Sequence, residues 1–321
     1  MIVDVSCWWK RPIEAKKKAI AEAPLNLDIL GQIRREVCLN KVNLILDSVD
    51  YAIEELLRYK KAGGNGLVDV STEGIGRNPE ALRKISTSSK THIICSTGWY
   101  LQISHPTFVR RTDERELTEI MIRELTEGIA ESGIRAGAIG EIGCSNPLHP
   151  EERKVLLAAT RAQERTGAPL TIHGVDKQGK ILEIIENRMV PQKTYLSHMD
   201  YADLSGEDLN FEKRIMDKGI NILYDRFGLE GFYDDSIYPG KLDVCTDTQR
   251  INAIVDLCKE GYDRNIMLSQ DICMKMQTVK YGGYGYAHIL EHIVPVLKHK
   301  GLSGKQIGNM LVENPKRVLS W

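Results

Sequence analysis

Short apolar runs alternate along the chain with segments whose hydrophobic residues recur at helical spacing. The apolar runs predict strands at 66–71, 91–97, 136–143, 169–174, 193–200, 221–225 and 266–271. Helices are predicted at 47–62, 78–85, 115–132, 150–166, 176–187, 206–218, 246–261 and 286–300. Nearly continuous apolar strands that alternate with helices are typical of a parallel sheet covered by helices.

A further apolar run at residues 2–6 would supply an eighth strand. Eight strand-and-helix units in 321 residues predict an α/β fold, a (β/α)8 TIM barrel that forms a single domain over residues 1–321. A doubly wound sheet is the alternative, but it requires a phosphate-binding loop after its first strand. Gly137, Gly140 and Gly143 do not have the Gly-x-Gly-x-x-Gly spacing of such a loop, so the barrel is the simpler prediction.

The overall composition is that of an ordinary soluble globular protein. The chain is 42% hydrophobic and 27% charged, and its formal net charge of −1 argues against nucleic acid or a membrane surface as a partner. Charged Lys10 and Arg11 stand where a signal peptide would have its apolar core. The seven cysteines include no Cys-x-x-Cys pair, which is typical of a reducing compartment. We therefore expect a cytoplasmic protein.

Side chains that can bind a metal stand near the C-terminal ends of four predicted strands. They are Glu141, His173, His198 and Asp271. We expect them to converge, because the C-terminal ends of barrel strands meet at one face. Each residue alone has a structural explanation, such as a hydrogen bond or an ion pair, but four in register favour a metal site. Imidazoles and carboxylates together suit Zn²⁺, with Mn²⁺ or Co²⁺ as alternatives, and a carboxylate can bridge two ions.

Such a site predicts a hydrolase. A metal pair lowers the pKa of a bridging water and polarises the substrate oxygen. The resulting hydroxide can attack an electrophile, and Asp271 can accept the proton that is released.

Several short motifs together resemble the phosphotriesterase-like proteins of the amidohydrolase superfamily. They are Gly140-Glu141-Ile142-Gly143, Ile172-His173, Ser197-His198, Asp225-Arg226-Phe227-Gly228, Leu268-Ser269-Gln270-Asp271 and the tail from Gly282 to Pro315. The resemblance runs from about residue 45 to the C-terminus and implies a (β/α)8 barrel with a binuclear metal centre. By this resemblance Glu141 bridges the two metals, His173 and His198 bind the more exposed one, and Asp271 binds the buried one and takes the proton.

One family motif is missing. Family members begin with a strand that ends in His-x-His, two ligands of the buried metal, and no His-x-His occurs in this sequence. Either the chain begins after that strand or the buried site is degenerate. We expect the former, because a barrel without its first strand would have two open sheet edges. With the remaining ligands we expect reduced metal occupancy, down to a mononuclear centre.

Two residues are predicted to contact a small-molecule substrate. Tyr100 follows the third strand and Arg226 lies in the Asp-Arg-Phe-Gly segment after the seventh, as in family members that resemble lactonases. This resemblance implies a lactone or carboxylic ester, with a phosphotriester as a further member of the class. Tyr100 would hydrogen-bond a lactone oxygen or the hydroxide, and Arg226 would anchor a loop or a substrate carboxylate. Trp8, Trp9 and Trp99 would line an apolar pocket or form a contact in a homodimer, which is the oligomer that we expect.

Two other functions stay open at this point. The missing His-x-His is consistent with a barrel that binds a small ligand without hydrolysing it. A zinc peptidase is a third candidate, because His288-Ile-Leu-Glu291-His292 matches the His-x-x-Glu-His pattern. Glu141→Gln should abolish activity in a metal-dependent hydrolase and Glu291→Gln in a peptidase, whereas neither would affect a pure binding protein.

Overall fold

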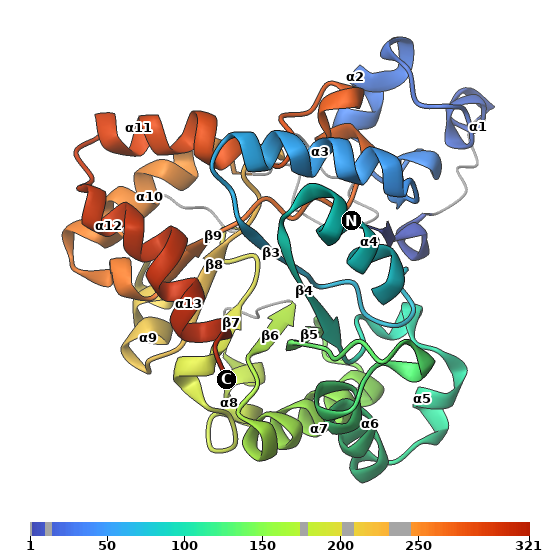
Figure 1. Ribbon diagram of the computed structural model, residues 1–321, viewed down its shortest axis with the longest axis vertical. Helices are drawn as coiled ribbons and strands as arrows, with labels where there is room; N and C mark the ends of the chain where they lie inside the picture. The colour runs from blue at the N-terminus through green and yellow to red at the C-terminus, as the bar shows by residue number, and fades with distance from the viewer. Residues whose placement is uncertain (1, 10–14, 174–178, 201–208, 231–244) are drawn as a thin grey trace.

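The centre of the molecule is a curled parallel sheet surrounded by helices (Figure 1). The computed structural model describes residues 2–9, 15–173, 179–200, 209–230 and 245–321. Seven strands pair in sequence order, namely β3 (Gly66–Asp69), β4 (His92–Thr97), β5 (Ala138–Gly143), β6 (Leu170–His173), β7 (Thr194–Leu196), β8 (Asn221–Tyr224) and β9 (Ile266–Leu268). Each predicted strand from 66 onward is therefore present, and the α/β barrel architecture is confirmed.

Helices follow the strands as the periodicity predicts, and most are shorter than predicted. They are α3 (Val49–Lys61), α4 (Pro79–Ser89), α6 (Glu114–Thr126), α7 (Pro150–Thr166), α8 (Lys180–Ile185), α9 (Asn210–Asp217), α10 (Asp247–Lys259) and, after a π-helical turn at Ile289–Ile293, α11 (Val294–His299). The starts of the helices predicted at 176 and 206 lie outside the described residues. The remaining helices, which the sequence analysis did not predict, are α1 (Ala15–Ala21), α2 (Leu27–Arg35), α5 (Thr107–Arg111), α12 (Gly304–Gly308) and α13 (Asn314–Leu319).

Residues 2–6 do not supply an eighth barrel strand. Val3–Asp4 (β1) pairs antiparallel with Ile45–Leu46 (β2) in a separate two-stranded sheet. The backbone N–H of Asp4 donates to the carbonyl of Ile75 at 3.0 Å, so β1 is held against the loop that follows β3. The prediction was wrong because an apolar run identifies a strand but not the strand with which it pairs.

The two largest apolar clusters hold the barrel and the N-terminal segment together. The larger lies between the sheet and helices α6 to α11, and it includes the fully buried Leu117 and Met121 of α6. The smaller joins the N-terminal segment to the chain after β9, where Ile33 and Leu44 share a cluster with Met274. The N-terminal segment is therefore packed onto the barrel at the end where the strands finish.

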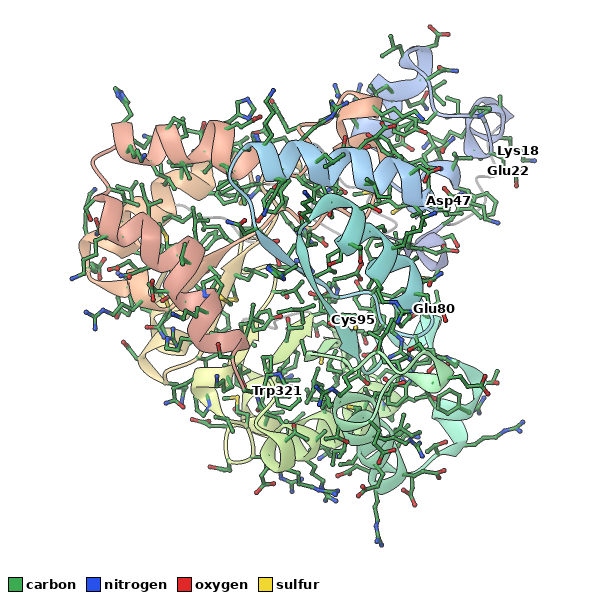
Figure 2. The ribbon with its side chains drawn as sticks, in the orientation of Figure 1. Lys18, Glu22, Asp47, Glu80, Cys95 and Trp321 are labelled. Atoms are coloured by element: carbon green, nitrogen blue, oxygen red, sulfur yellow. The ribbon has the colours of Figure 1, made fainter. Side chains whose placement is uncertain are left out.

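The C-terminus lies at the opposite end of the strands. Trp321, labelled in Figure 2, donates its indole N–H to the carbonyl of Gly137, just before β5 begins. Within the described part of the chain, no helix has both the length and the apolar character needed to cross a bilayer.

We expect Leu117→Ala to lower the free energy of unfolding by about 2 to 5 kcal/mol, because it removes buried methyl groups and leaves a cavity. Leu57→Ala is the matched control, since Leu57 is a helical leucine that is 48% exposed, and its change should stay within about 0.5 kcal/mol. Urea unfolding followed by circular dichroism measures both. Equal losses in the two variants would contradict the assignment of Leu117 to the main core.

Candidate metal centre

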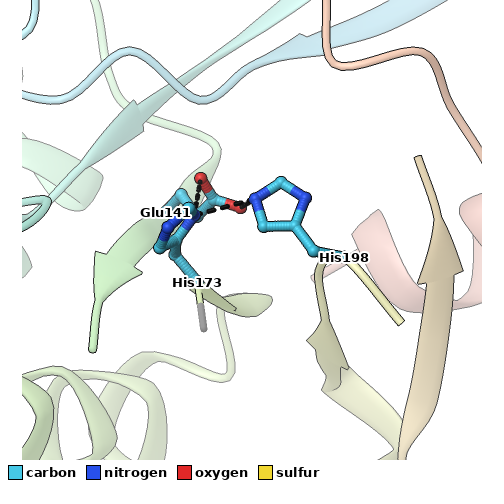
Figure 3. Close-up of side chains that lie close together, drawn as sticks. All are labelled: Glu141, His173 and His198. Atoms are coloured by element: carbon cyan, nitrogen blue, oxygen red, sulfur yellow. Dashed lines mark hydrogen bonds and ion pairs between the residues drawn. The ribbon is translucent and has the colours of Figure 1, made fainter. Parts of the chain in front are cut away.

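Glu141, His173 and His198 meet at the C-terminal ends of three neighbouring strands (Figure 3). Glu141 lies in β5, His173 ends β6 and His198 follows β7 by two residues. One ligand atom from each side chain lies within 4.8 Å of the others. Nδ1 of His173 is 3.1 Å from Oε2 of Glu141 and 2.8 Å from Nε2 of His198. The convergence predicted from the strand ends is therefore observed for these three residues.

Two glycines in β5 let this strand approach its neighbours closely. A Cβ atom on Gly143 would lie 2.2 Å from the carbonyl carbon of Tyr100. A Cβ atom on Gly140, whose φ is +107°, would lie 2.3 Å from the carbonyl oxygen of Thr171 in β6. Only glycine fits at either position, so Gly140 brings β5 close to β6 and Gly143 brings β5 close to the chain around Tyr100.

Two predicted ligands have left-handed backbone conformations. φ is +60° at His198 and +44° at Asp271, and both residues lie just beyond strand ends. Such conformations are uncommon in residues other than glycine and persist only where the surrounding structure holds them. These two conformations turn the chain just after β7 and just after β9, where the strands end at the mouth of the barrel.

Asp225 orients His198, a role that the sequence analysis missed. Its Oδ1 accepts a hydrogen bond from Nδ1 of His198 at 2.8 Å, and both of its oxygens accept from the His198 backbone N–H. Donation from Nδ1 leaves the lone pair of His198 on Nε2, the atom that faces Glu141 at 3.5 Å. Carboxylates commonly orient metal-binding histidines in this way. The sequence feature that could have revealed this role is the position of Asp225 at the end of the apolar strand predicted at 221–225.

Tyr100 lies beside the three clustered residues and contacts His173. Its hydroxyl lies 2.8 Å from Nε2 of His173, and only 2% of the residue is exposed. His105 holds the Tyr100 loop, because its two ring nitrogens contact the Tyr100 carbonyl at 2.7 Å and Oε1 of Glu151 at 2.6 Å. The ring of Trp8 from the N-terminal segment lies 6.1 Å from the Tyr100 ring. Tyr100 therefore lies beside His173, and its contact with a substrate stays a prediction.

The charges of the three ligands suit metal binding. Burial lowers the pKa of His173 and of His198, so both imidazoles keep their lone pairs at neutral pH. Burial alone would raise the pKa of Glu141, but the two histidines favour its charged form and lower this pKa to about 2.

Two more carboxyl groups lie around these three residues. Burial raises the pKa of Asp225 well above its usual range, and repulsion from Asp200 adds to the effect. Burial also raises the pKa of Asp271 to about 6, with the charge of His198 opposing it and those of Asp225 and Glu141 adding to it. A divalent cation would relieve this concentration of negative charge. Two neutral imidazoles and an ionised carboxylate are a donor set typical of Zn²⁺, so the residues present fit a divalent metal ion.

The structure separates Asp271 from the three clustered ligands. Asp271 is half-buried beyond β9, near enough to His198 for the histidine to oppose the rise in its pKa, but it is not part of the group whose atoms converge within 4.8 Å. Arg226 is buried after β8, where its backbone N–H donates to Asp200 at 3.0 Å and its charge opposes the raised pKa of Asp225 and of Asp271. Both residues therefore lie around the centre.

The His-x-x-Glu-His segment does not form a peptidase site. His288 is buried and bonded to Asp247, whereas Glu291 is exposed. Among the described residues, the only three metal-capable side chains that converge are Glu141, His173 and His198.

Comparison with known proteins identifies the family of this chain. The profile of the Phosphotriesterase family matches residues 28–319. The chain belongs to the phosphotriesterase family. It is thus a hydrolase of the phosphotriesterase-like kind, in a family of metal-dependent enzymes, as the sequence motifs implied.

Individual relatives cover nearly the whole chain. An N-acetyltaurine hydrolase from Salmo salar is 36% identical over 312 residues, which are 95% of this chain and 87% of the salmon protein. A resiniferatoxin-binding protein from Rhodobacter sphaeroides has a TM-score of 0.94 at 33% identity, covering 99% of this chain and 88% of that protein. The phosphotriesterase homology protein from Escherichia coli, solved with phosphate in its active site, has a TM-score of 0.77 at 25% identity, covering 93% and 96% of the two chains.

We expect Asp225→Asn to weaken Zn²⁺ binding by about 10- to 100-fold, because the amide no longer holds His198 in the ligating tautomer. Competition with a chromophoric chelator measures the affinity. Asp256→Asn removes a carboxylate from an exposed ion pair with Lys259 and serves as the control. Unchanged affinity in Asp225→Asn would mean that the hydrogen bond to His198 does not determine how this ligand is presented.

Proposed function

We propose that this protein is a metal-dependent hydrolase that cleaves a carboxylic amide, with N-acetyltaurine or a similar N-acylated amino acid as its substrate. The convergence of Glu141, His173 and His198, with Asp225 behind His198, is the observation that supports metal dependence. The choice of an amide rests on relatives named N-acetyltaurine hydrolase, such as the Salmo salar protein, which is 36% identical over 95% of this chain. These relatives favour an amide over the lactone, ester or phosphotriester expected from the motifs.

Glu141, His173 and His198 would hold the ion, a Zn²⁺ ion or a similar divalent cation, and Asp271 would extend the site toward a second one. When bound, such an ion polarises a carbonyl oxygen and makes water a stronger nucleophile at neutral pH. Asp225 keeps the lone pair of His198 directed at the ligand position through the 2.8 Å hydrogen bond at Nδ1.

Asp271 is the proposed proton carrier. In amide hydrolysis a water oxygen bonds to the carbonyl carbon, the C–N bond breaks and the nitrogen gains a proton. Asp271 would take the proton from the water and return it to the leaving amine, because it lies beside the centre but outside the converging group of three. The other such carboxyl group, Asp225, is bonded to His198.

Tyr100 and Arg226 are the proposed substrate contacts. The Tyr100 hydroxyl, 2.8 Å from His173, lies where it can donate a hydrogen bond to the substrate carbonyl oxygen or to the attacking water. Arg226 adds positive charge on the same side as Asp225 and Asp271. A sulfonate or carboxylate on the substrate would be drawn toward this charge.

We expect Glu141→Gln to lose both bound metal and hydrolysis of N-acetyltaurine, because the neutral amide is a poor metal ligand. Metal content by mass spectrometry and release of taurine measure the two effects. Glu291→Gln is the control, since Glu291 is an exposed glutamate in the π-helical turn Ile289–Ile293. This substitution should change neither the metal content nor the hydrolysis. Full activity in Glu141→Gln would refute a metal-dependent mechanism at this centre.

The same assay tests the substrate class. Wild-type protein should hydrolyse N-acetyltaurine more efficiently than a γ-lactone or an aryl phosphotriester when values of kcat/KM are compared. A higher kcat/KM for the lactone would replace the amide with the ester-type substrate that Tyr100 and the Asp-Arg-Phe-Gly segment imply.

We expect Tyr100→Phe to lower kcat/KM by about tenfold, which corresponds to losing one hydrogen bond worth about 1.4 kcal/mol, while metal content stays unchanged. Tyr262→Phe is the control, because it removes a hydroxyl that bonds Asp217 at an exposed site. An unchanged kcat/KM in Tyr100→Phe would remove Tyr100 from the set of substrate contacts.

A further inference from the structure

A second series of one carboxylate and two imidazoles lies outside the metal centre. Asp247 opens α10, and His288 and His292 lie one turn apart after the β9 loop. Nε2 of His288 is 2.7 Å from Oδ2 of Asp247, and Nδ1 of His288 is 3.2 Å from Nδ1 of His292. The metal centre has the same order of groups, in which Asp225 bonds His198 at 2.8 Å and His198 faces His173 at 2.8 Å.

The first two members of this series are held rigidly. Asp247 accepts hydrogen bonds from the backbone N–H of Gly228 at 3.0 Å and from Arg250 at 2.9 Å. The Tyr284 ring stacks on His288, with centroids 4.2 Å apart and an angle of 18° between the rings. These contacts leave His288 with a fixed position and ring orientation.

The open side of the pair faces solvent. His288 is 3% exposed, whereas His292 is exposed, so an ion from solution can reach the space between them. The turn Ile289–Ile293 that carries His292 is π-helical. Such turns are rare and occur frequently at functional sites.

The hydrogen bonding assigns a lone pair to the inner histidine. Oδ2 of Asp247 accepts a hydrogen bond from Nε2–H of His288, so in the neutral ring the lone pair lies on Nδ1, which faces His292. Two nitrogens bound to one tetrahedral Zn²⁺ ion at about 2.0 Å each lie about 3.3 Å apart. The observed separation of 3.2 Å therefore lets both nitrogens bind one ion with little movement.

We propose that His288 and His292 form a second, independent binding site for a divalent transition metal ion of the Zn²⁺, Ni²⁺ or Cu²⁺ type. Asp247 orients His288, and water completes the coordination, because no third metal-capable side chain joins the pair among the described residues. This arrangement explains why the His-x-x-Glu-His segment contains two metal-binding residues without forming a peptidase.

The test counts zinc ions per chain. Metal-free full-length protein is dialysed to equilibrium against Zn²⁺, and bound zinc is measured by mass spectrometry. His292→Gln should bind one zinc ion fewer than wild type. His299→Gln is the matched control, since His299 is an exposed histidine at the end of α11, and it should bind as many as wild type.

The measurement is separate from the proposed function. The difference between wild type and His292→Gln should also be one ion when both carry Glu141→Gln, so it does not depend on what the main centre holds. Equal zinc counts in wild type and His292→Gln would overturn the proposal and identify the pair as a hydrogen bond between two histidines.

Asp247→Asn tests the positioning role of the carboxylate. It should weaken zinc binding at this site by about 10- to 100-fold without removing it at saturating zinc, whereas His292→Gln removes it. Because Asp247 also bonds Arg250 and Gly228, folding of the variant is checked by circular dichroism. If Asp247→Asn fails to fold, the zinc counts of wild type and His292→Gln decide the test, because His292 is exposed.

Discussion

Parallel pairing of strands in sequence order is the constraint on which the rest of this structure depends. The register pairs Gly143 with His173 and Ile172 with Leu196, so the C-terminal ends of β5, β6 and β7 lie side by side. Residues separated by more than twenty positions along the chain thereby meet in one site. Glycines at 140 and 143 extend this constraint, because a side chain at either position would push β5 away from its neighbours.

Convergence of polar groups in the interior has an electrostatic cost that the fold offsets with pairs of opposite charge. Asp200 and Arg250 are both fully buried, and Nε of Arg250 lies 2.6 Å from Oδ2 of Asp200. The same Asp200 oxygen accepts from the backbone N–H of Arg226, and Arg250 also bonds Asp247. One network of charges therefore runs from the residues behind the metal centre to the histidine pair. Loss of one partner from such a network leaves a buried charge uncompensated, which typically costs about 3 to 5 kcal/mol.

The N-terminal segment connects the outer part of the molecule to the centre. Its apolar side chains cluster with residues that follow β9, and β1 bonds to the loop after β3. This packing positions Trp8 6.1 Å from Tyr100, which in turn contacts His173. Residues near position 8 and residues near position 100 thus lie together beside His173, although the first follow β1 of the two-stranded sheet and the second follow β4 of the seven-stranded sheet.

The sequence by itself determined the order of the seven strands from residue 66 onward, the barrel architecture and the three side chains that cluster, Glu141, His173 and His198. It could do so because apolar periodicity reports burial, and because the C-terminal end of every parallel strand lies at the same face. Only the tertiary structure decided that Val3–Asp4 pairs with Ile45–Leu46, that Asp225 orients His198, and that His288 lies beside Asp247. Each of these depends on a contact between distant segments, and the local pattern of hydrophobic and polar residues does not specify the partner in such a contact.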